Sequence, residues 1–483
     1  MKELSQLLPI KSNIEIHTLS TDSRQKCAQS IFFCLKGLAN DGHLHVLEAI
    51  ENGALVIVHS DDVDMSLTNV IYHRVEDVNV CLNTVLNIFY EDPSSHLKMI
   101  GVTGTNGKST IAKTLKELLN NELPCGYSGT ISIEYGSKTL KPNYTTPESI
   151  EFVSILHDMV HEGMKAASLE ISSQGLDQRR VDAVKFDYAI FTNLTHDHLD
   201  YHGTMENYYL SKKHLFELLK DSAQSIINID DAYGERLYKE LSSHKYSYST
   251  HKHADYRAEH IHYGAYQTTF TLITPKEKFE VKTNFVAEFN LSNLLSVIAV
   301  YDLMGFSLST LVKRLESLPA VEGRMNVLTL GQKFTCVVDY AHTPDGFKKI
   351  FEFAKTITPS HAKIIAVYGA AGHRDKKKRA ILGQISDEYA DRIILTEEDP
   401  RTESALEIAQ QISMGIEHTP YVIVLDRYDA IFQACELASK DDTVLILAKG
   451  NEQYMARKNG KEFWMGDEAA LSEIIKGKLN ETE

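Results

Sequence analysis

The sequence has few cysteines, and their spacing matches no disulfide or zinc motif. Its six cysteines are scattered over 483 residues, and no two form a C-x-x-C pair. A disulfide framework and a zinc ribbon both need closely spaced cysteines, so the pattern argues against both. It fits a protein of the reducing cytosol.

Long apolar runs are also missing. The stretch MKELSQLLPIKSN at the start lacks the apolar core of a signal peptide. No run approaches the roughly 18 to 20 apolar residues that span a bilayer. The sequence therefore predicts a cytoplasmic chain with no membrane insertion.

Positive charge is in deficit. Lys and Arg total 50 against 66 Asp and Glu, which leaves a formal net charge of −16. This balance disfavours a nucleic-acid partner or an anionic membrane surface. An anionic ligand must then be met locally, by loops, a few basic side chains and metal ions. The length exceeds what one core supports, so two to four domains are expected.

Two breaks divide the chain into three units, expected at residues 1–95, 96–325 and 326–483. The first is the Pro/Ser-rich EDPSSH (Glu91 to His96), and the second is LPAVEGRMNVL (Leu318 to Leu328). After each break, apolar runs that close on polar residues alternate with helical patterns. This alternation predicts α/β units with mostly parallel sheets, whose strand carboxyl edges bind ligands. We expect the two edges to face each other.

The stretch GVTGTNGKST, Gly101 to Thr110, is typical of a phosphate-binding loop, although Val102 stands where the common G-x-x-x-x-G-K-[ST] pattern has its first glycine. Gly104 and Gly107 would let backbone N–H groups approach phosphate oxygens. Lys108 would reach the β- and γ-phosphates, and the Ser109 hydroxyl a Mg²⁺. The helical spacing of Ile111, Leu115, Leu118 and Leu119 supports a helix after the loop. A surface lysine after a glycine turn is the weaker alternative.

Three further features carry candidate chemistry, each with a plainer alternative. Glu170 ends an apolar run, where a second carboxylate of a nucleotide site holds metal, yet alone it fits a capping or solvated acid. His196, Asp197, His198, Asp200 and His202 crowd after a strand, as in metal or phosphate chemistry, but match no zinc spacing. Lys212 and Phe216 share a helix face, and spacing alone favours an exposed lysine.

Taken together, these stretches resemble the Mur ligase family of ATP-dependent amide-bond ligases in peptidoglycan precursor synthesis. The resemblance rests on GTNGKST, NYTTPES, EISSQGLDQRRV, TNLTHDHLDYHGTMENYY, KKHLF, FNLSNLL, EGRMNVL, VDYAHTPDG, GHRDKKKR, DPRTE and AKGNE, with LSTDSR near the start. It implies three domains: a UDP-substrate-binding domain, a P-loop central ATPase and a Rossmann-like C-terminal domain. The family loop begins at Gly104, so Val102 is no defect.

The resemblance also implies the reaction and its cofactors, ATP and Mg²⁺. A substrate carboxylate takes the γ-phosphoryl group of ATP, and an amine then attacks the acyl phosphate. Lys108, Lys212 and His198 are the implied catalytic residues, with Lys212 carried as a carbamate. Ser109, Glu170, His198 and Lys212 are the implied metal ligands. The implied ATP-binding residues are Gly104, Thr105, Asn106, Gly107, Lys108, Ser109, Thr110, Asn290, Arg324, Asp339 and His342.

The implied substrates are a UDP-N-acetylmuramoyl dipeptide and a free amino acid, taken up by a monomer. Uridine contacts are matched by Thr21 and Ser23, and the rest of the nucleotide-linked substrate by Thr145, Thr146, Ser172, Gln178 and Arg180. The amino acid is matched by Arg374, Glu398, Asp399, Pro400, Arg401 and Glu452. A guanidinium at Arg401 favours meso-diaminopimelate, which has a distal carboxylate. The acids at Glu398 and Asp399, where the family has Asp and Asn, favour L-lysine, and Arg401 paired with one of them would select nothing.

Three rival functions are weaker. A folylpolyglutamate synthase has a residue between the loop lysine and the hydroxyl and lacks the UDP-binding domain. A GTP-driven switch protein needs an N-K-x-D signature, which is absent. An inactive binding protein on the same fold is disfavoured because Lys108, Glu170, His198 and Lys212 are all present.

Overall fold

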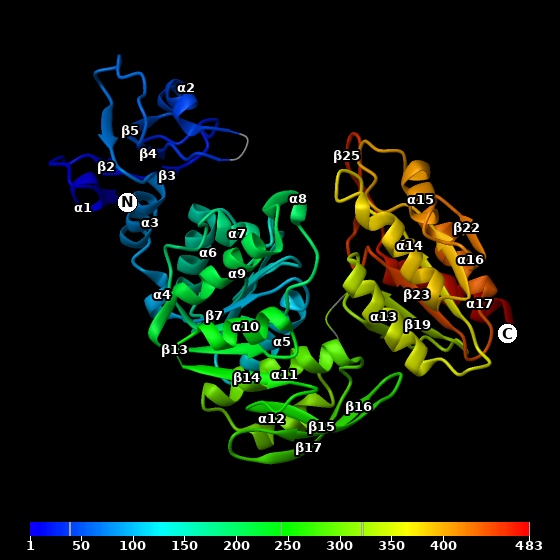
Figure 1. The fold of residues 1–483 in the computed structure, drawn as a ribbon. Helices are drawn as coiled ribbons and strands as arrows, with labels where there is room; N and C mark the ends of the chain where they lie inside the picture. Colours follow the sequence, from blue (N-terminus) through cyan, green and yellow to red (C-terminus); the bar gives the residue numbers. More distant parts are fainter. Residues whose placement is uncertain (38–39, 243, 320, 322, 483) are drawn as a thin grey trace.

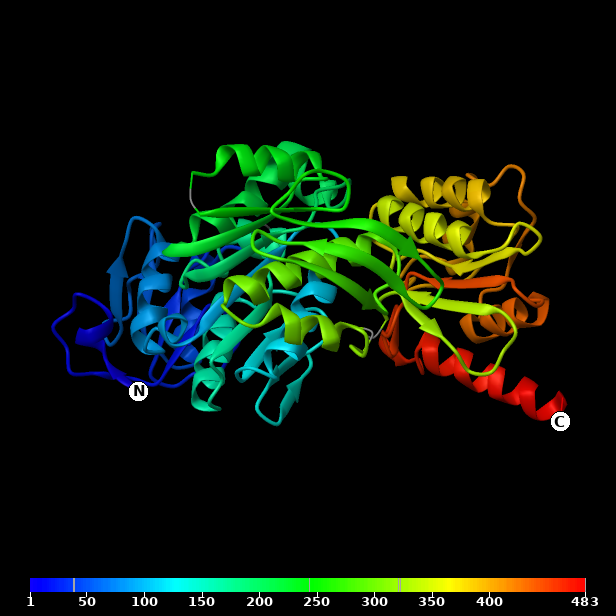
Figure 2. The same cartoon turned by 90° about the horizontal axis from the view of Figure 1, so that it is seen from below.

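The structure is a computed structural model that describes residues 1–37, 40–242, 244–319, 321 and 323–482. Three bodies follow one another along the chain, each on its own sheet, and the two termini lie at opposite ends of the molecule (Figures 1 and 2). Among the helices described, none has the length and apolar character that crossing a membrane would require.

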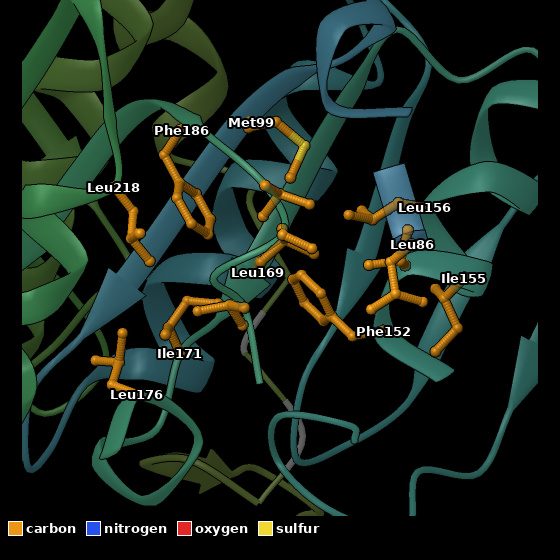
Figure 3. Packing of buried hydrophobic residues seen from close by; sticks show 14 of the residues in the cluster. Leu86, Met99, Phe152, Ile155, Leu156, Leu169, Ile171, Leu176, Phe186 and Leu218 are labelled. Carbon is orange, nitrogen blue, oxygen red and sulfur yellow. The ribbon is translucent and has the colours of Figure 1, made fainter. Parts of the chain in front are cut away.

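The first body is a four-stranded parallel sheet in chain order: β3 (Thr18–Ser20), β4 (Ser30–Phe33), β5 (Ala54–His59) and β6 (Ile71–Arg74). A small pair, β1 (Lys2–Glu3) and β2 (Glu15–Ile16), and helices α1 (Leu4–Leu7) and α2 (Val46–Glu51) accompany it. Helix α3 (Val78–Phe89) leads out of this body, and its Leu86 lies beside Ile155 and Leu156 of α6 (Ser149–His161) in Figure 3. The expected break at EDPSSH is the short helix α4 (Pro93–His96).

The second body holds an eleven-stranded sheet in the order β10-β9-β8-β11-β7-β12-β13-β14-β15-β16-β17. It is parallel from β8 to β15 and antiparallel at both ends, which confirms the expected mostly parallel sheet. The strands are β7 (Lys98–Thr103), β8 (Cys125–Ser128), β9 (Ile133–Tyr135), β10 (Lys138–Leu140), β11 (Ala166–Glu170), β12 (Phe186–Phe191), β13 (Leu219–Asn228), β14 (Lys245–Ser249), β15 (Tyr256–Tyr263), β16 (Thr268–Ile273) and β17 (Lys278–Thr283).

Helices cover both faces of this sheet because strand residues alternate between them. Met99 of β7 packs in a core with α6 and α9 (Met205–Glu217). Its neighbour Ile100 packs in a second core with α5 (Lys108–Leu119), α11 (Glu288–Leu303) and α12 (Leu308–Leu315). Shorter helices α7 (Ser173–Asp177), α8 (Leu199–His202) and α10 (Ala232–Glu240) complete the body.

The third body is a six-stranded sheet in the order β18-β19-β23-β20-β21-β22, parallel except at β18. Its strands are β18 (Asn326–Leu328), β19 (Thr335–Asp339), β20 (Ile364–Tyr368), β21 (Arg392–Leu395), β22 (Tyr421–Ile423) and β23 (Thr443–Leu447). Helices α13 (Pro344–Ile357), α14 (Lys377–Tyr389) and α15 (Ala405–Ser413) cover one face, and α16 (Arg427–Leu437) and α17 (Asp467–Thr482) the other (Figure 1). A hairpin, β24 (Tyr454–Arg457) and β25 (Gly460–Phe463), follows β23.

The second and third bodies turn the carboxyl ends of their parallel strands toward one shared cavity. Residues after β7, β11 and β12 line it from one side, and residues after β19, β20, β21 and β23 line it from the other. The expectation that the two edges face each other is confirmed. Two residues of the predicted break at Leu318 to Leu328, numbers 320 and 322, lie outside the described residues.

Candidate active site

The loop between β7 and α5 has the geometry of a phosphate-binding loop. Lys108 opens the helix, while Gly104 and Gly107 take φ angles of 152° and 90°. A Cβ at Gly104 would collide with the Thr192 side chain, so a residue with a side chain does not fit there. Val102, which replaces the first glycine of the common pattern, is a fully buried residue of β7. The helix predicted after the loop is confirmed.

Two lysines converge on one carbonyl oxygen of this loop. The Nζ of Lys108 donates to the carbonyls of Gly104 at 2.8 Å and Thr105 at 2.9 Å, and the Nζ of Lys212 donates to the same Gly104 oxygen at 2.8 Å. Lys212 is 1% exposed, so the exposed lysine favoured from spacing alone is wrong. Burial, reinforced by the charge of Lys108, holds the pKa of Lys212 well below its usual range.

Glu170 is a buried carboxylate aimed at the loop, and the solvated or capping alternative is wrong. It accepts hydrogen bonds from the Ser109 hydroxyl at 2.8 Å, the Tyr127 hydroxyl at 2.6 Å and the backbone N–H of Thr130 at 3.0 Å. A carboxylate beside a hydroxyl supplies the oxygen ligands that Mg²⁺ prefers, so the pair fits such an ion. Within the described residues no cluster of three or more His, Cys, Asp or Glu could hold a metal. Phosphate oxygens would have to add ligands here.

Arg324, at the junction with the third body, reaches the loop. Its Nη2 donates to the Ser109 hydroxyl at 3.2 Å, and its guanidinium lies 4.5 Å from the ring centroid of Tyr340. Asp339 stands behind it and accepts the backbone N–H groups of Met325 at 2.6 Å and Ala341 at 2.7 Å. Asp339 therefore fixes the turn that carries Arg324.

Other contacts join the same two bodies. The Asn106 side chain donates to Asp345 of α13 at 3.1 Å, and His196 lies 3.7 Å from Asp375.

His342, within the third body, donates through Nδ1 to the carbonyl of Tyr340 at 2.9 Å. Burial and the nearby charge of Lys378 lower the pKa of His342 to about 4, so the ring is neutral near neutral pH.

Lys449 is fully buried between two carboxylates of the third body. Its Nζ donates to Asp399 at 2.7 Å and to Glu452 at 2.6 Å, and lies 4.3 Å from the ring centroid of Tyr454. Asp399 also accepts the backbone N–H of Ala456 at 2.8 Å. These bonds connect the loop after β21, the loop after β23 and the hairpin that follows.

Arg401 is not paired with its acidic neighbours. Its guanidinium donates to the carbonyl of Gly372, and among the described residues it forms no ion pair with Glu398 or Asp399. Burial, with the charge of Asp399 adding to it, raises the pKa of Glu398 to about 7. Arg374 is exposed on the same cavity wall. Arg374 and Arg401 therefore reach the cavity from this body, and no ion pair among the described residues joins either of them to a carboxylate.

A further set of cavity-lining side chains belongs to the second body, on the side that faces Arg374 and Arg401. Arg180 donates to the carbonyl of Thr146 at 2.8 Å and to the Gln178 side chain at 2.6 Å, and pairs with Glu148 at 2.9 Å. Ser172 caps α7 by accepting the N–H of Gly175 at 3.1 Å. Thr145 exchanges a 3.0 Å hydrogen bond with Thr130, beside Glu170.

One cavity of about 1450 Å³ brings most of the predicted residues together. Its lining includes Thr105, Asn106, Gly107, Lys108, Ser109, Thr110, Thr145, Glu170, Ser172, Arg180, His198, Lys212, Arg324, His342, Arg374, Glu398, Asp399, Arg401 and Glu452. The described residues Gly104, Thr146, Gln178, Asn290, Asp339 and Pro400 are not part of the lining, nor are Thr21 and Ser23. Asn290 and Asn293 lie on α11, and a Cβ at Gly107 would meet the side chain of Asn293.

Sequence reasoning missed several side chains of this site. Lys449 lies within the motif AKGNE, but no role was predicted for it, and no sequence pattern marks Tyr127 or Tyr454. A lysine two residues after a buried strand and three residues before a glutamate was the local signal for Lys449. Tyr127 could be found only through the fold, because its partner Glu170 is 43 residues away. Tyr454 contacts Glu452 and Lys449, which are close in sequence, but no motif marks these contacts.

Comparison with known proteins places these features in context. Models described as the Mur ligase family catalytic domain, the Mur ligase middle domain and the Mur ligase glutamate ligase domain match residues 15–100, 102–301 and 323–450. A UDP-N-acetylmuramoyl-L-alanyl-D-glutamate–2,6-diaminopimelate ligase of Clostridium botulinum is 37% identical, over 99% of this chain and 98% of its own. A solved structure of a ligase of that description is 30% identical, with a TM-score of 0.70 and 99% of both chains covered. The MurF ligase of Thermotoga maritima in complex with ADP shares the fold at 21% identity and a TM-score of 0.64, over 96% of this chain and 98% of its own.

Proposed function

The chain belongs to the Mur ligase family, and from that premise we propose that it adds meso-2,6-diaminopimelate to UDP-N-acetylmuramoyl-L-alanyl-D-glutamate in an ATP-dependent reaction. This would make it a tripeptide synthetase of peptidoglycan precursor synthesis. The observation that carries the proposal is the shared cavity, in which a phosphate-binding loop from one body faces Arg374 and Arg401 of the other.

The reaction needs ATP because a free carboxylate is a poor acyl donor. The carboxylate oxygen of the nucleotide-linked substrate attacks the γ-phosphorus, the bond to the β-phosphate oxygen breaks, and ADP leaves. The amine of the amino acid then attacks the acyl phosphate carbon, loses a proton and expels phosphate. Lys108 and the loop N–H groups hold the phosphates, and Arg324 adds positive charge beside Ser109 where negative charge accumulates.

Mg²⁺ would be held by Ser109 and Glu170, with His198 and a modified Lys212 at a second position. When bound, the ion neutralises phosphate charge. Lys212 as an ammonium would repel a cation. Its lowered pKa supports a neutral amine, which forms an N–C bond to CO₂ and releases a proton to give an anionic carbamate. We therefore assign Lys212 a carbamate in the active enzyme.

The three units are given separate tasks in this proposal. Residues 1–95 would hold the uridine nucleotide through Thr21 and Ser23, 96–325 the ATP, and 326–483 the incoming amino acid. Thr145, Ser172 and Arg180 line the cavity on the side from which the peptide carboxylate would approach. The protein would act as a cytoplasmic monomer.

The choice of meso-diaminopimelate over L-lysine rests on charge. Arg401 and Arg374 offer guanidinium groups suited to a distal carboxylate. The opposing acids are weakened, because Asp399 is paired with Lys449 and the pKa of Glu398 is raised to about 7. These two acids therefore repel a second carboxylate less than two free carboxylates would.

The test is ATP turnover that depends on both substrates. Purified protein should release phosphate only when ATP, the UDP-muramoyl dipeptide and an amino acid are all present, and faster with meso-diaminopimelate than with L-lysine. Arg401→Ala should raise KM for meso-diaminopimelate by about tenfold or more, the size of one lost charged hydrogen bond. A preference for L-lysine that survives this substitution would refute the assignment of the amino acid.

A further inference from the structure

A buried trio of charged side chains lies directly behind the amino-acid end of the cavity. Asp399 and Glu452 line the cavity, whereas Lys449, 0% exposed, contacts both carboxylates from behind and is not part of the lining. Lys449 therefore acts on the cavity through residues that line it, the two acids and the ring of Tyr454. A buried ammonium of this kind is retained only where opposite charge compensates its desolvation.

The charge of the trio depends on this one lysine. One ammonium and two carboxylates leave a single net negative charge, and without the ammonium the cavity wall would carry two. Glu398, next to Asp399 and itself 7% exposed, adds a further carboxyl group at the same place. An amino acid with a second carboxylate would then face repulsion beside Arg401, the group that is to receive it.

The backbone around the trio is held in unusual conformations. Asp399, Arg401 and Ala448 all have left-handed φ angles, of 39°, 53° and 83°. Residues other than glycine persist there only where the surroundings hold them. The bonds from Lys449 and from the N–H of Ala456 to the Asp399 carboxylate, at 2.7 and 2.8 Å, provide that hold.

We propose that Lys449 is a positioning residue that sets amino-acid specificity, as the buried counter-charge that lets this pocket accept a substrate with a second carboxylate. The inference rests on the proposed function. Its distinctive feature is the Asp399 carboxylate, two residues before Arg401. Lys449 balances the negative charge of Asp399. Removal of the Lys449 charge and removal of the Asp399 charge should shift the preference between an amino acid with two carboxylates and one with a single carboxylate in opposite directions.

Charge-changing variants at the two positions test this directly. Lys449→Met leaves two net negative charges, Asp399→Asn leaves none, and the double variant restores one. Steady-state kinetics should therefore order KM for meso-diaminopimelate as Asp399→Asn at or below wild type, the double variant within about threefold of wild type, and Lys449→Met raised by about tenfold or more. KM for ATP should stay within about twofold throughout, and the ratio of L-lysine to meso-diaminopimelate use should rise only in Lys449→Met.

The controls separate this inference from folding and from the proposed function. Lys458→Met, at an exposed lysine in the turn of the β24–β25 hairpin, should change neither KM nor the preference between the two amino acids. If Lys449→Met does not fold, the double variant, which has the same net charge at this place as wild type, should fold and bind meso-diaminopimelate. The counter-charge role would be overturned if KM for meso-diaminopimelate were as high in the double variant as in Lys449→Met. An unchanged KM in Lys449→Met would overturn it as well. Wild-type protein that ignores meso-diaminopimelate altogether would instead refute the proposed function.

Discussion

Replacement of Lys108 by alanine should nearly abolish ligation while leaving the fold intact. The Lys108 ammonium lies in the loop and donates to two carbonyls, at 2.8 and 2.9 Å, from which it can turn to incoming phosphate oxygens. Loss of such a charged contact to a transferring phosphoryl group costs about 3 kcal/mol or more of transition-state stabilisation. At about 1.4 kcal/mol per factor of ten, kcat/KM should fall by roughly 150-fold or more.

The loop itself should survive this change, because the Gly104 carbonyl keeps its bond from Lys212 at 2.8 Å. Phosphate release in the full ligation mixture measures the effect, and thermal unfolding checks the fold. Lys116→Ala on the same helix is the matched control, since Lys116 pairs only with Glu117 and Glu134 among the described ion pairs. Activity of Lys108→Ala within about threefold of wild type would refute the assignment of a nucleotide site, because it would show that Lys108 does not contact the transferring phosphoryl group.

Three further changes follow from the same geometry. Lys212→Ala should be almost inactive and partly rescued by a small carboxylic acid in solution, whereas an unmodified amine in an ATP-bound crystal equilibrated with CO₂ would contradict the carbamate. Gly107→Ala should weaken ATP binding by about tenfold or more, because φ is 90° and the added Cβ meets the Asn293 side chain; unchanged calorimetric affinity would argue against the loop geometry. The Glu398 carboxyl, with its pKa raised from 4.5 to about 7, stabilises the fold below the unfolded pKa, and this contribution is lost as pH rises through about 7. Urea unfolding should thus show that the free energy of unfolding of Glu398→Gln, relative to that of wild type, is higher at about pH 8 than at about pH 5. A difference that does not depend on pH would exclude a raised pKa.

Patterns that are local in sequence were predictable. Alternating apolar runs and helical spacings indicated the parallel sheets, and the run from Gly104 to Ser109 indicated a phosphate loop, because a strand, a turn and a helix dictate these features within a few residues. The facing strand edges also followed, since polar residues gathered after successive strands. These predictions needed no knowledge of which residues meet across the chain.

Features that depend on contacts across the chain were not predictable in the same way. Spacing alone favoured an exposed Lys212, but the packing of α9 against β7 buries it against the Gly104 carbonyl, 108 residues away. The expected conflict between Arg401 and its acidic neighbours is resolved by Lys449, 50 residues beyond Asp399. In both cases the environment of a charge is set by tertiary packing, which the order of residues along one element does not reveal.

The most direct test of the account is a competition between the two amino acids. Wild-type protein is incubated with ATP, UDP-N-acetylmuramoyl-L-alanyl-D-glutamate and equal concentrations of meso-diaminopimelate and L-lysine, and the product is identified by mass spectrometry. The account predicts an ATP-dependent UDP-muramoyl tripeptide that carries meso-diaminopimelate almost exclusively. A product that carries L-lysine would contradict the proposed specificity, and no tripeptide with either amino acid would contradict the proposed function.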